Sequence, residues 1–226
     1  HMGWSLPVGV SKCSTEEGQR KSLAMAKVKL ECAKFGLKLF EDVVLKNQAY
    51  VDLILSDAYQ TVTNYMGLGD RNNKVNFYDG TIRVVDTEAK EIDRFKPADY
   101  LKHVSEHVEP WSYLKFPYLK KIGWKGFVEG NQSGIYRAAP LARLNVADGM
   151  ATSLAQEAYE KYFDTLGGKP VHSTLATHWA RLVELLYAAE RQLELVQDIG
   201  ITDPKVRVIP AKVPEEGVGV VEAPRG

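Results

Sequence analysis

The sequence has few cysteines and no pair of them at a metal-binding spacing. Only Cys13 and Cys32 occur among 226 residues, and they lie 19 positions apart. Without a C-x-x-C pair, neither a zinc ribbon nor a redox dithiol can form. Because free cysteine is one of the most buried residue types, we expect two buried or half-buried thiols in a reducing cytosol.

A charge imbalance and long apolar runs are also missing. The 29 basic and 29 acidic residues cancel, and no long run of like charge suggests a nucleic-acid surface. No run of about 18 apolar residues predicts a membrane span. The first residues lack the layout of a secretory signal, and His1-Met2 resembles a remnant of an expression tag. Length and composition suit one large domain, or two small ones sharing a core.

Nucleotide and metal motifs are lacking as well. There is no Walker loop, and the 67–69 Gly-Leu-Gly stretch is too short for a dinucleotide fingerprint. His103 and His107 could share a helix face, but Glu106 stands in the wrong position for H-E-x-x-H and no third ligand is near. We interpret the two histidines as part of a solvated helix, and we predict no metal site.

Three segments have the periodicity of long amphipathic helices. The first covers 14–47, with Ser14 and Glu17 forming a capping-box pattern at its start. The second covers 153–166 and is closed by two glycines, and the third runs from 172 to Gly200. The apolar stripe of the third helix consists of Leu175, Trp179, Leu182, Leu186, Ala189 and Leu193.

Between these helices the sequence favours strands. Strand-forming runs at 75–78 and 81–85 flank Asp79-Gly80, a strong hairpin signal, and a third run near 91–95 completes an antiparallel meander at 74–95. A helix is predicted from Pro97 over 97–108, whereas 109–145 is too rich in Gly, Pro and aromatics for a regular helix. An extended tail is predicted over 205–226. The fold class is therefore mainly α with a small inserted antiparallel sheet (α+β), as a single domain over 1–226.

Two arginines follow a proline at short distance. Arg143 lies in "AAPLARLN" and Arg225 in "EAPRG". Proline stiffens the backbone that carries each guanidinium, and a guanidinium suits an anionic or polarised ligand in a dry pocket. An internal ion pair is the commoner role for such a residue, so the residues alone leave both interpretations open.

Six blocks of the sequence, in order, resemble one protein family. They are "VNFYDGTIRVVD", "WSYLKFPYLKKIGW", "YRAAPLARLNVADGMA", "LAQEAYEKYFDTLGGKP", "HSTLATHWARLVELLYAAE" and "EEGVGVVEAPRG". They resemble the large subunits of nickel–iron hydrogenases, in the soluble cytoplasmic branch of NAD-reducing and methanogen F420-non-reducing enzymes. The resemblance covers nearly the whole chain and implies a long-helix core.

The resemblance also implies a reaction and a site. Such large subunits hold nickel and iron, with cyanide and carbon monoxide on the iron, and cleave H2 heterolytically. By motif, Arg225 would be the catalytic residue, and Ala223, Pro224 and Glu222 would line the active-site pocket. A guanidinium on rigid backbone can stabilise charge that develops as the H–H bond polarises. A small iron–sulfur subunit would be the partner, H2 the substrate, and the cytoplasm the location.

The sequence departs from that family at decisive positions. The family holds its metals through two C-x-x-C pairs, both absent here, and Cys13 and Cys32 do not match ligand positions. A thiolate-bound centre cannot form without thiolates. We therefore expect a central portion of a large subunit that binds no cofactor and is inactive alone. Val8 and Ala139 also stand where the family usually has glycine, at tight backbone positions.

Two other hypotheses stay open. The chain could be a hydrogenase-like relative that is cysteine-free at the metal positions and serves as a structural or quinone/electron-transfer-complex subunit. It could also be a helical interaction module, in which an exposed apolar face favours self-association. Whether the chain is an enzyme is left open.

Overall fold

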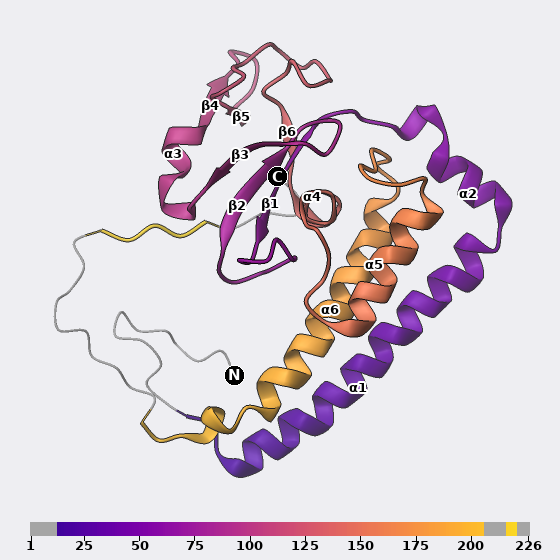
Figure 1. The fold of residues 1–226 in the computed structure, drawn as a ribbon, viewed down its shortest axis with the longest axis vertical. Helices are drawn as coiled ribbons and strands as arrows, with labels where there is room; N and C mark the ends of the chain where they lie inside the picture. The colour runs from indigo at the N-terminus through magenta and orange to yellow at the C-terminus, as the bar shows by residue number, and fades with distance from the viewer. Residues whose placement is uncertain (1–12, 206–215, 221–226) are drawn as a thin grey trace.

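The computed structural model describes residues 13–205 and 216–220. Figure 1 shows a layer of long helices on one side and strands on the other. The α-helices are α1 (Glu16–Phe40), α2 (Gln48–Leu55), α3 (Tyr100–His103), α4 (Ala139–Val146), α5 (Ser153–Thr165) and α6 (Thr177–Gln197). Shorter helical turns are η1 (Glu41–Leu45), η2 (Asp57–Tyr59), η3 (Pro97–Asp99) and η4 (Ile199–Thr202). The strands are β1 (Asn64–Gly69), β2 (Thr81–Val85), β3 (Glu91–Phe95), β4 (Val104–Val108), β5 (Lys115–Leu119) and β6 (Tyr136–Arg137).

Helix α1 begins one residue later than the capping pattern predicts. The hydroxyl of Thr15 accepts a hydrogen bond from the amide of Gly18 at 3.0 Å, so Thr15 is the N-cap. The backbone N–H of Ser14 donates instead to the carbonyl of Ile201 at 3.1 Å. The chain before α1 is therefore tied to η4, which follows α6.

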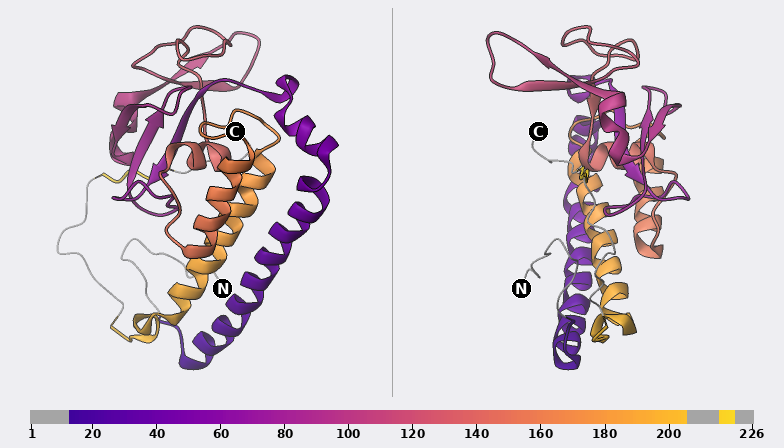
Figure 2. Two further views of the ribbon diagram at one scale, coloured as in Figure 1. Left: turned by 45° about the vertical axis from the view of Figure 1, so that its right-hand side comes forward. Right: turned by 90° about the vertical axis from the view of Figure 1, so that its left-hand side faces the viewer.

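The three long helices pack side by side. Ala26 and Ala33 of α1 are buried against α6, and their small side chains allow the two helices to approach closely. Trp179 of α6 is 1% exposed, with its ring 5.7 Å from Phe40 and 5.2 Å from Tyr162 of α5. Figures 1 and 2 show α1 along the outer edge of this layer, with α6 and α5 on its inner side.

The main sheet has the strand order β3-β2-β1-β6, and only the β1–β6 pair is parallel. The prediction that 75–78 forms a strand is wrong, because β2 pairs with β1 in the register Tyr65↔Val85. The carboxylate of Asp70 accepts from the amides of Asn72 and Lys74, and these bonds turn the chain out of the sheet. Residues 70–80 therefore form a loop.

The predicted helix over 97–108 is also wrong in its second half. Helix ends at His103, and 104–108 becomes β4, which pairs antiparallel with β5 in the register Val104↔Leu119. The residues of β4 can adopt either structure, and pairing with a distant segment decides between them. The third long helix ends at Gln197, earlier than the predicted Gly200.

Residues 139–146 were expected to be irregular, but they form α4. Pro140 occupies the first turn, where its missing N–H costs nothing, and the helix is almost fully buried. The fold class is confirmed: a mainly helical α+β protein with long helices and a small sheet. Within 13–205 and 216–220, none of the helices combines the length and apolar character needed to span a bilayer.

Candidate functional site

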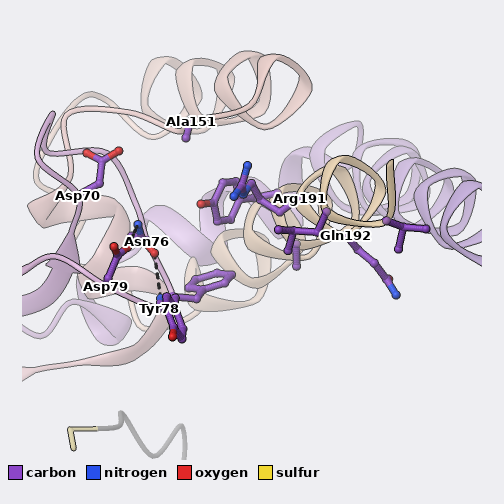
Figure 3. Close-up of a pocket in the computed structure, with 12 residues that line it drawn as sticks. Asp70, Asn76, Tyr78, Asp79, Ala151, Arg191 and Gln192 are labelled. Atoms are coloured by element: carbon purple, nitrogen blue, oxygen red, sulfur yellow. Dashed lines mark hydrogen bonds between the residues drawn. The ribbon is translucent and has the colours of Figure 1, made fainter. Parts of the chain in front are cut away.

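A cleft of about 520 Å³ lies between the 70–80 loop and α6. Figure 3 shows Asp70, Asn76 and Asp79 on the loop side, and Arg191 and Gln192 on the helix side. Its lining residues are Asp70, Asn76, Phe77, Tyr78, Asp79, Ala151, Tyr187, Ala188, Arg191, Gln192, Leu195 and Val196. The lining combines the carboxylates of Asp70 and Asp79 with the aromatic rings of Phe77, Tyr78 and Tyr187.

Hydrogen bonds within the loop hold its side of the cleft. The Asn76 side chain donates to the Asp79 carboxylate at 3.1 Å and accepts from the amide of Tyr78 at 2.9 Å. This arrangement leaves the Tyr78 side chain 94% exposed at the rim. On the opposite side, Arg191 forms an ion pair with Glu194 one turn along α6.

A buried ion pair supports the floor of the cleft. The guanidinium of Arg143 binds both carboxylate oxygens of Glu184, at 2.6 and 2.7 Å, and lies 5.3 Å from the centre of the Phe77 ring. Phe77 meets Tyr187 edge to face at 5.2 Å. Burial raises the pKa of Glu184, and Arg143 counteracts that rise. Of the two roles considered for Arg143, the structure shows the internal ion pair.

A second buried carboxylate fixes α5 beside the cleft. Glu190 of α6 accepts from the hydroxyl of Thr152 at 2.6 Å and from the amides of Leu154 and Ala155 at 3.1 and 2.9 Å. Since the first amides of a helix have no partner within it, Glu190 caps α5 from a neighbouring helix. Sequence reasoning missed this role, because 38 positions separate Glu190 from Thr152.

A third polar cluster lies where β1, β6 and the segment before α6 meet. Arg137 donates to the carbonyls of Thr61 and His172 at 2.6 and 2.7 Å, and to the Tyr65 hydroxyl at 3.1 Å. The Tyr65 hydroxyl lies 2.5 Å from Nδ1 of His172. Burial, with help from the Arg137 charge, lowers the pKa of His172. Arg137 therefore joins three separate segments around a neutral imidazole.

Lys169 is a half-buried amine in the segment between α5 and α6. Its ammonium group donates to the carbonyl of Ala147 and to the hydroxyl of Tyr159. Burial lowers the pKa of Lys169 to about 8, from an ordinary value of 10.5. The folded state therefore releases this proton at a lower pH than the unfolded chain does.

Stability should consequently rise with pH because of Lys169. Between about pH 8 and pH 10.5 the unfolded chain binds more protons at this site than the folded protein. We expect the free energy of unfolding of the wild type, relative to Lys169→Met, to rise by about 1–2 kcal/mol from pH 7.5 to pH 9.5. Urea denaturation at a series of pH values measures this difference. An exposed control, Lys125→Met, should run parallel to the wild type, and a flat wild-type-minus-Lys169→Met difference would contradict the argument.

The residues predicted to form the catalytic site cannot be placed. Arg225, Ala223, Pro224 and Glu222 lie outside the described residues. They remain a prediction from the resemblance.

The cysteines and histidines do not converge. The prediction of two buried or half-buried thiols holds for Cys13 but is wrong for Cys32, which is exposed on α1. Roughly 24 Å of helix separates Cys32 from the start of α1 near Cys13. His103 bonds to Asp93 at 2.7 Å, and His107 to Glu109 at 2.9 Å.

Those contacts occupy side chains that a metal would need. In the part of the chain that the structure describes, no three His, Cys, Asp or Glu side chains group to hold a metal ion. The residues present therefore do not fit a thiolate-bound nickel–iron centre.

Comparison with known proteins shows similarity to hydrogenase subunits. No family model matches the chain. The curated proteins that resemble it are subunits of hydrogenases, and the similarity extends over almost all of its length.

Three particular relatives illustrate the similarity. The chain is 51% identical over 221 residues to the iron-sulfur subunit of the F420-non-reducing hydrogenase of Archaeoglobus profundus, covering 98% of this chain and 45% of the relative. It is 40% identical over 199 residues to the beta subunit of the NAD-reducing hydrogenase HoxS of Cupriavidus necator, covering 87% of this chain and 38% of the relative. A solved NAD+-reducing [NiFe]-hydrogenase in its H2-reduced state matches with a TM-score of 0.82 and 31% identity, over 98% of this chain and 47% of that one. The chain thus spans about half the length of the relatives it matches.

These names correct one prediction. We expected the central portion of a nickel–iron hydrogenase large subunit, but the relatives are named as iron-sulfur, vhu or beta subunits. The large-subunit assignment, and the function drawn from it, are therefore wrong. The alternative of a hydrogenase-like structural or electron-transfer-complex subunit fits these relatives better.

Proposed function

We propose that this chain is a structural part of a multi-subunit hydrogenase, which holds neighbouring subunits together and binds no nickel–iron centre of its own. The observation that carries the proposal is the 51% identity, along 98% of the chain, to one subunit of a hydrogenase. Identity over so much surface and core together supports a shared fold with a shared place in an assembly.

The geometry supports a scaffolding role. Several polar side chains are used inside the protein: Arg143 binds Glu184, Glu190 caps α5, and Arg137 ties β1 and β6 to the segment before α6. Buried, fully partnered groups of this kind fix one arrangement of elements. Large apolar side chains are nevertheless exposed, among them Phe35 at 65% and Trp111 at 68%. Such side chains are typical of surfaces that contact other proteins.

The finer part of the proposal concerns partners and cofactor. One partner would be the small iron–sulfur subunit, and the assembly would act on H2. A nickel–iron centre would not be bound by this chain, because the described residues offer no converging ligands. A cytoplasmic location remains a prediction.

Copurification and metal analysis test the proposal together. The chain, tagged and coexpressed with the small iron–sulfur subunit, should purify with it in a fixed ratio, while the chain expressed alone should contain nickel far below one atom per molecule. The fold of the isolated chain is checked by circular dichroism in the same samples. Stoichiometric nickel in the isolated, folded chain would overturn the cofactor part. A folded chain that never associates with the small subunit would overturn the scaffolding part.

A further inference from the structure

Helix α1 carries a second apolar stripe in addition to the one that packs on α6. The stripe lies on the exposed face of the helix and consists of Met25, Val28, Cys32, Phe35 and Leu39. Phe35 is 65% exposed and Leu39 is 50% exposed, whereas Ala26 and Ala33 on the packed face are at most 2% exposed. At 100° per residue, the two stripes point to nearly opposite sides of the helix.

The spacing of this stripe is that of a helix-pairing seam. Its members follow one another at steps of three, four, three and four residues, which is the a/d pattern of a heptad repeat. Over these residues the stripe extends for about 21 Å, long enough to contact a second helix over several turns. Figures 1 and 2 show α1 at the outer edge of the helical layer.

The charge around the stripe is unbalanced. Helix α1 contains six Lys and Arg residues against three Glu, and two of those acids stand in its first turn. In that heptad the charged side chains that flank the stripe at e and g positions are Lys29, Glu31 and Lys38, all exposed, and Glu31 already forms an ion pair with Lys34 at 2.9 Å. A helix that packs on the stripe therefore meets a basic rim.

We propose that this face of α1 is the docking site for an acidic amphipathic helix of a partner subunit. The inference rests on the proposed function and names the chemistry of the partner. Leucine-like side chains would fill the seam, and glutamates beside them would pair with the basic rim. A second copy of this chain fits less well, because antiparallel pairing of two α1 helices places Lys29 opposite Lys29 and Glu31 opposite Glu31.

Two matched peptides test the proposal on the full chain. Both contain four heptads with leucine at the a and d positions; one has glutamate at e and g, and the other has lysine there. We expect the acidic peptide to bind at least about tenfold more tightly than the basic one in fluorescence anisotropy. We also expect it to slow alkylation of Cys32, since that thiol lies in the seam.

Variants of α1 test whether the acidic peptide binds at the exposed stripe. Val28→Glu and Phe35→Glu should each weaken binding of the acidic peptide by about tenfold or more, because they put charge into the seam. Val108→Glu, at an equally exposed apolar position on β4, should leave it unchanged. Circular dichroism of each variant verifies that α1 still folds.

Several results would overturn the proposal. Equal binding of the two peptides would indicate apolar capture without charge recognition. A dimer that crosslinks through Cys32 would make a second copy the occupant. A Cys32 that is already protected in the isolated monomer would mean that this chain covers the face itself.

Copurification with the hydrogenase subunits distinguishes failure of this inference from failure of the proposed function on which it rests. A Phe35→Glu chain that still copurifies fully with the hydrogenase subunits sinks the inference and leaves the function standing. A wild-type chain that binds the acidic peptide but never joins those subunits overturns the proposed function and leaves the inference standing.

Discussion

Replacing Arg143 with methionine is expected to lower the free energy of unfolding by about 3–5 kcal/mol, because it leaves a buried carboxylate without its partner. Glu184 is 6% exposed, and Arg143 supplies two of its hydrogen bonds at 2.6 and 2.7 Å. The loss of the guanidinium also removes the contact with the Phe77 ring under the cleft. Urea denaturation at pH 7 measures the change.

Two further variants separate the missing charge from the missing volume. The double variant Arg143→Met/Glu184→Leu should recover most of the stability, since apolar residues of similar size replace both charges. Arg94→Met, which breaks an ion pair with Glu91 at a half-exposed site, should cost less than about 1 kcal/mol. A loss as small as that in Arg143→Met would contradict the argument.

The single variant should also respond to pH in a defined direction. Burial raises the pKa of Glu184 already in the wild type, and loss of Arg143 removes the main group that offsets that rise, leaving only the weaker effect of the Arg181 charge. The folded variant then binds more protons than the unfolded chain above the ordinary glutamate pKa, so acidification should restore part of its stability relative to wild type.

Long helices were the most predictable part of this fold. The stripe with Trp179 and Leu186 predicts α6, and Trp179, Leu186 and Ala189 are indeed buried. A run of apolar residues at three- and four-residue steps needs no distant partner to be recognised. The second stripe on α1 escaped attention because only the structure shows which of two apolar faces is packed.

Strands were harder to predict because their partners lie far away in the sequence. The Asp79-Gly80 pair does precede β2, but the strand that pairs with β2 is β1, which begins at Asn64. The 70–80 loop separates the two strands, so the pair does not form a tight hairpin turn. The same reasoning explains β4, whose pairing with β5 cannot be deduced from five residues alone.

Within the candidate site, local sequence indicates single residues but not their pairing. Arg143 was singled out as an arginine on stiffened backbone, yet its partner Glu184 lies 41 positions away. Ala139, noted for standing where glycine is usual, adopts φ of 73° and so does occupy a position that favours glycine.

Replacing Gly80 with alanine is expected to be the other severe change, at about 2–5 kcal/mol of lost stability. Gly80 has φ of 135°, which L side chains rarely adopt, at a cost of about 1–2 kcal/mol. A Cβ added there would lie 2.0 Å from the carbonyl oxygen of Gly69, so the backbone must move at an additional cost of about 1–3 kcal/mol. Because Gly69 pairs with Thr81 at the end of the β1–β2 ladder, that movement opens the ladder beside the cleft.

Gly126→Ala is the matched control for this change. Gly126 also has positive φ, of 85°, but a Cβ added there meets nothing within 4 Å. It should therefore cost only the backbone strain, about 1–2 kcal/mol. Thermal and urea denaturation compare the two variants, and hydrogen exchange of the amides in 81–85 reports the ladder directly. Equal losses in the two variants would mean that strain alone acts at Gly80, and that its close approach to Gly69 does not hold the loop against the sheet.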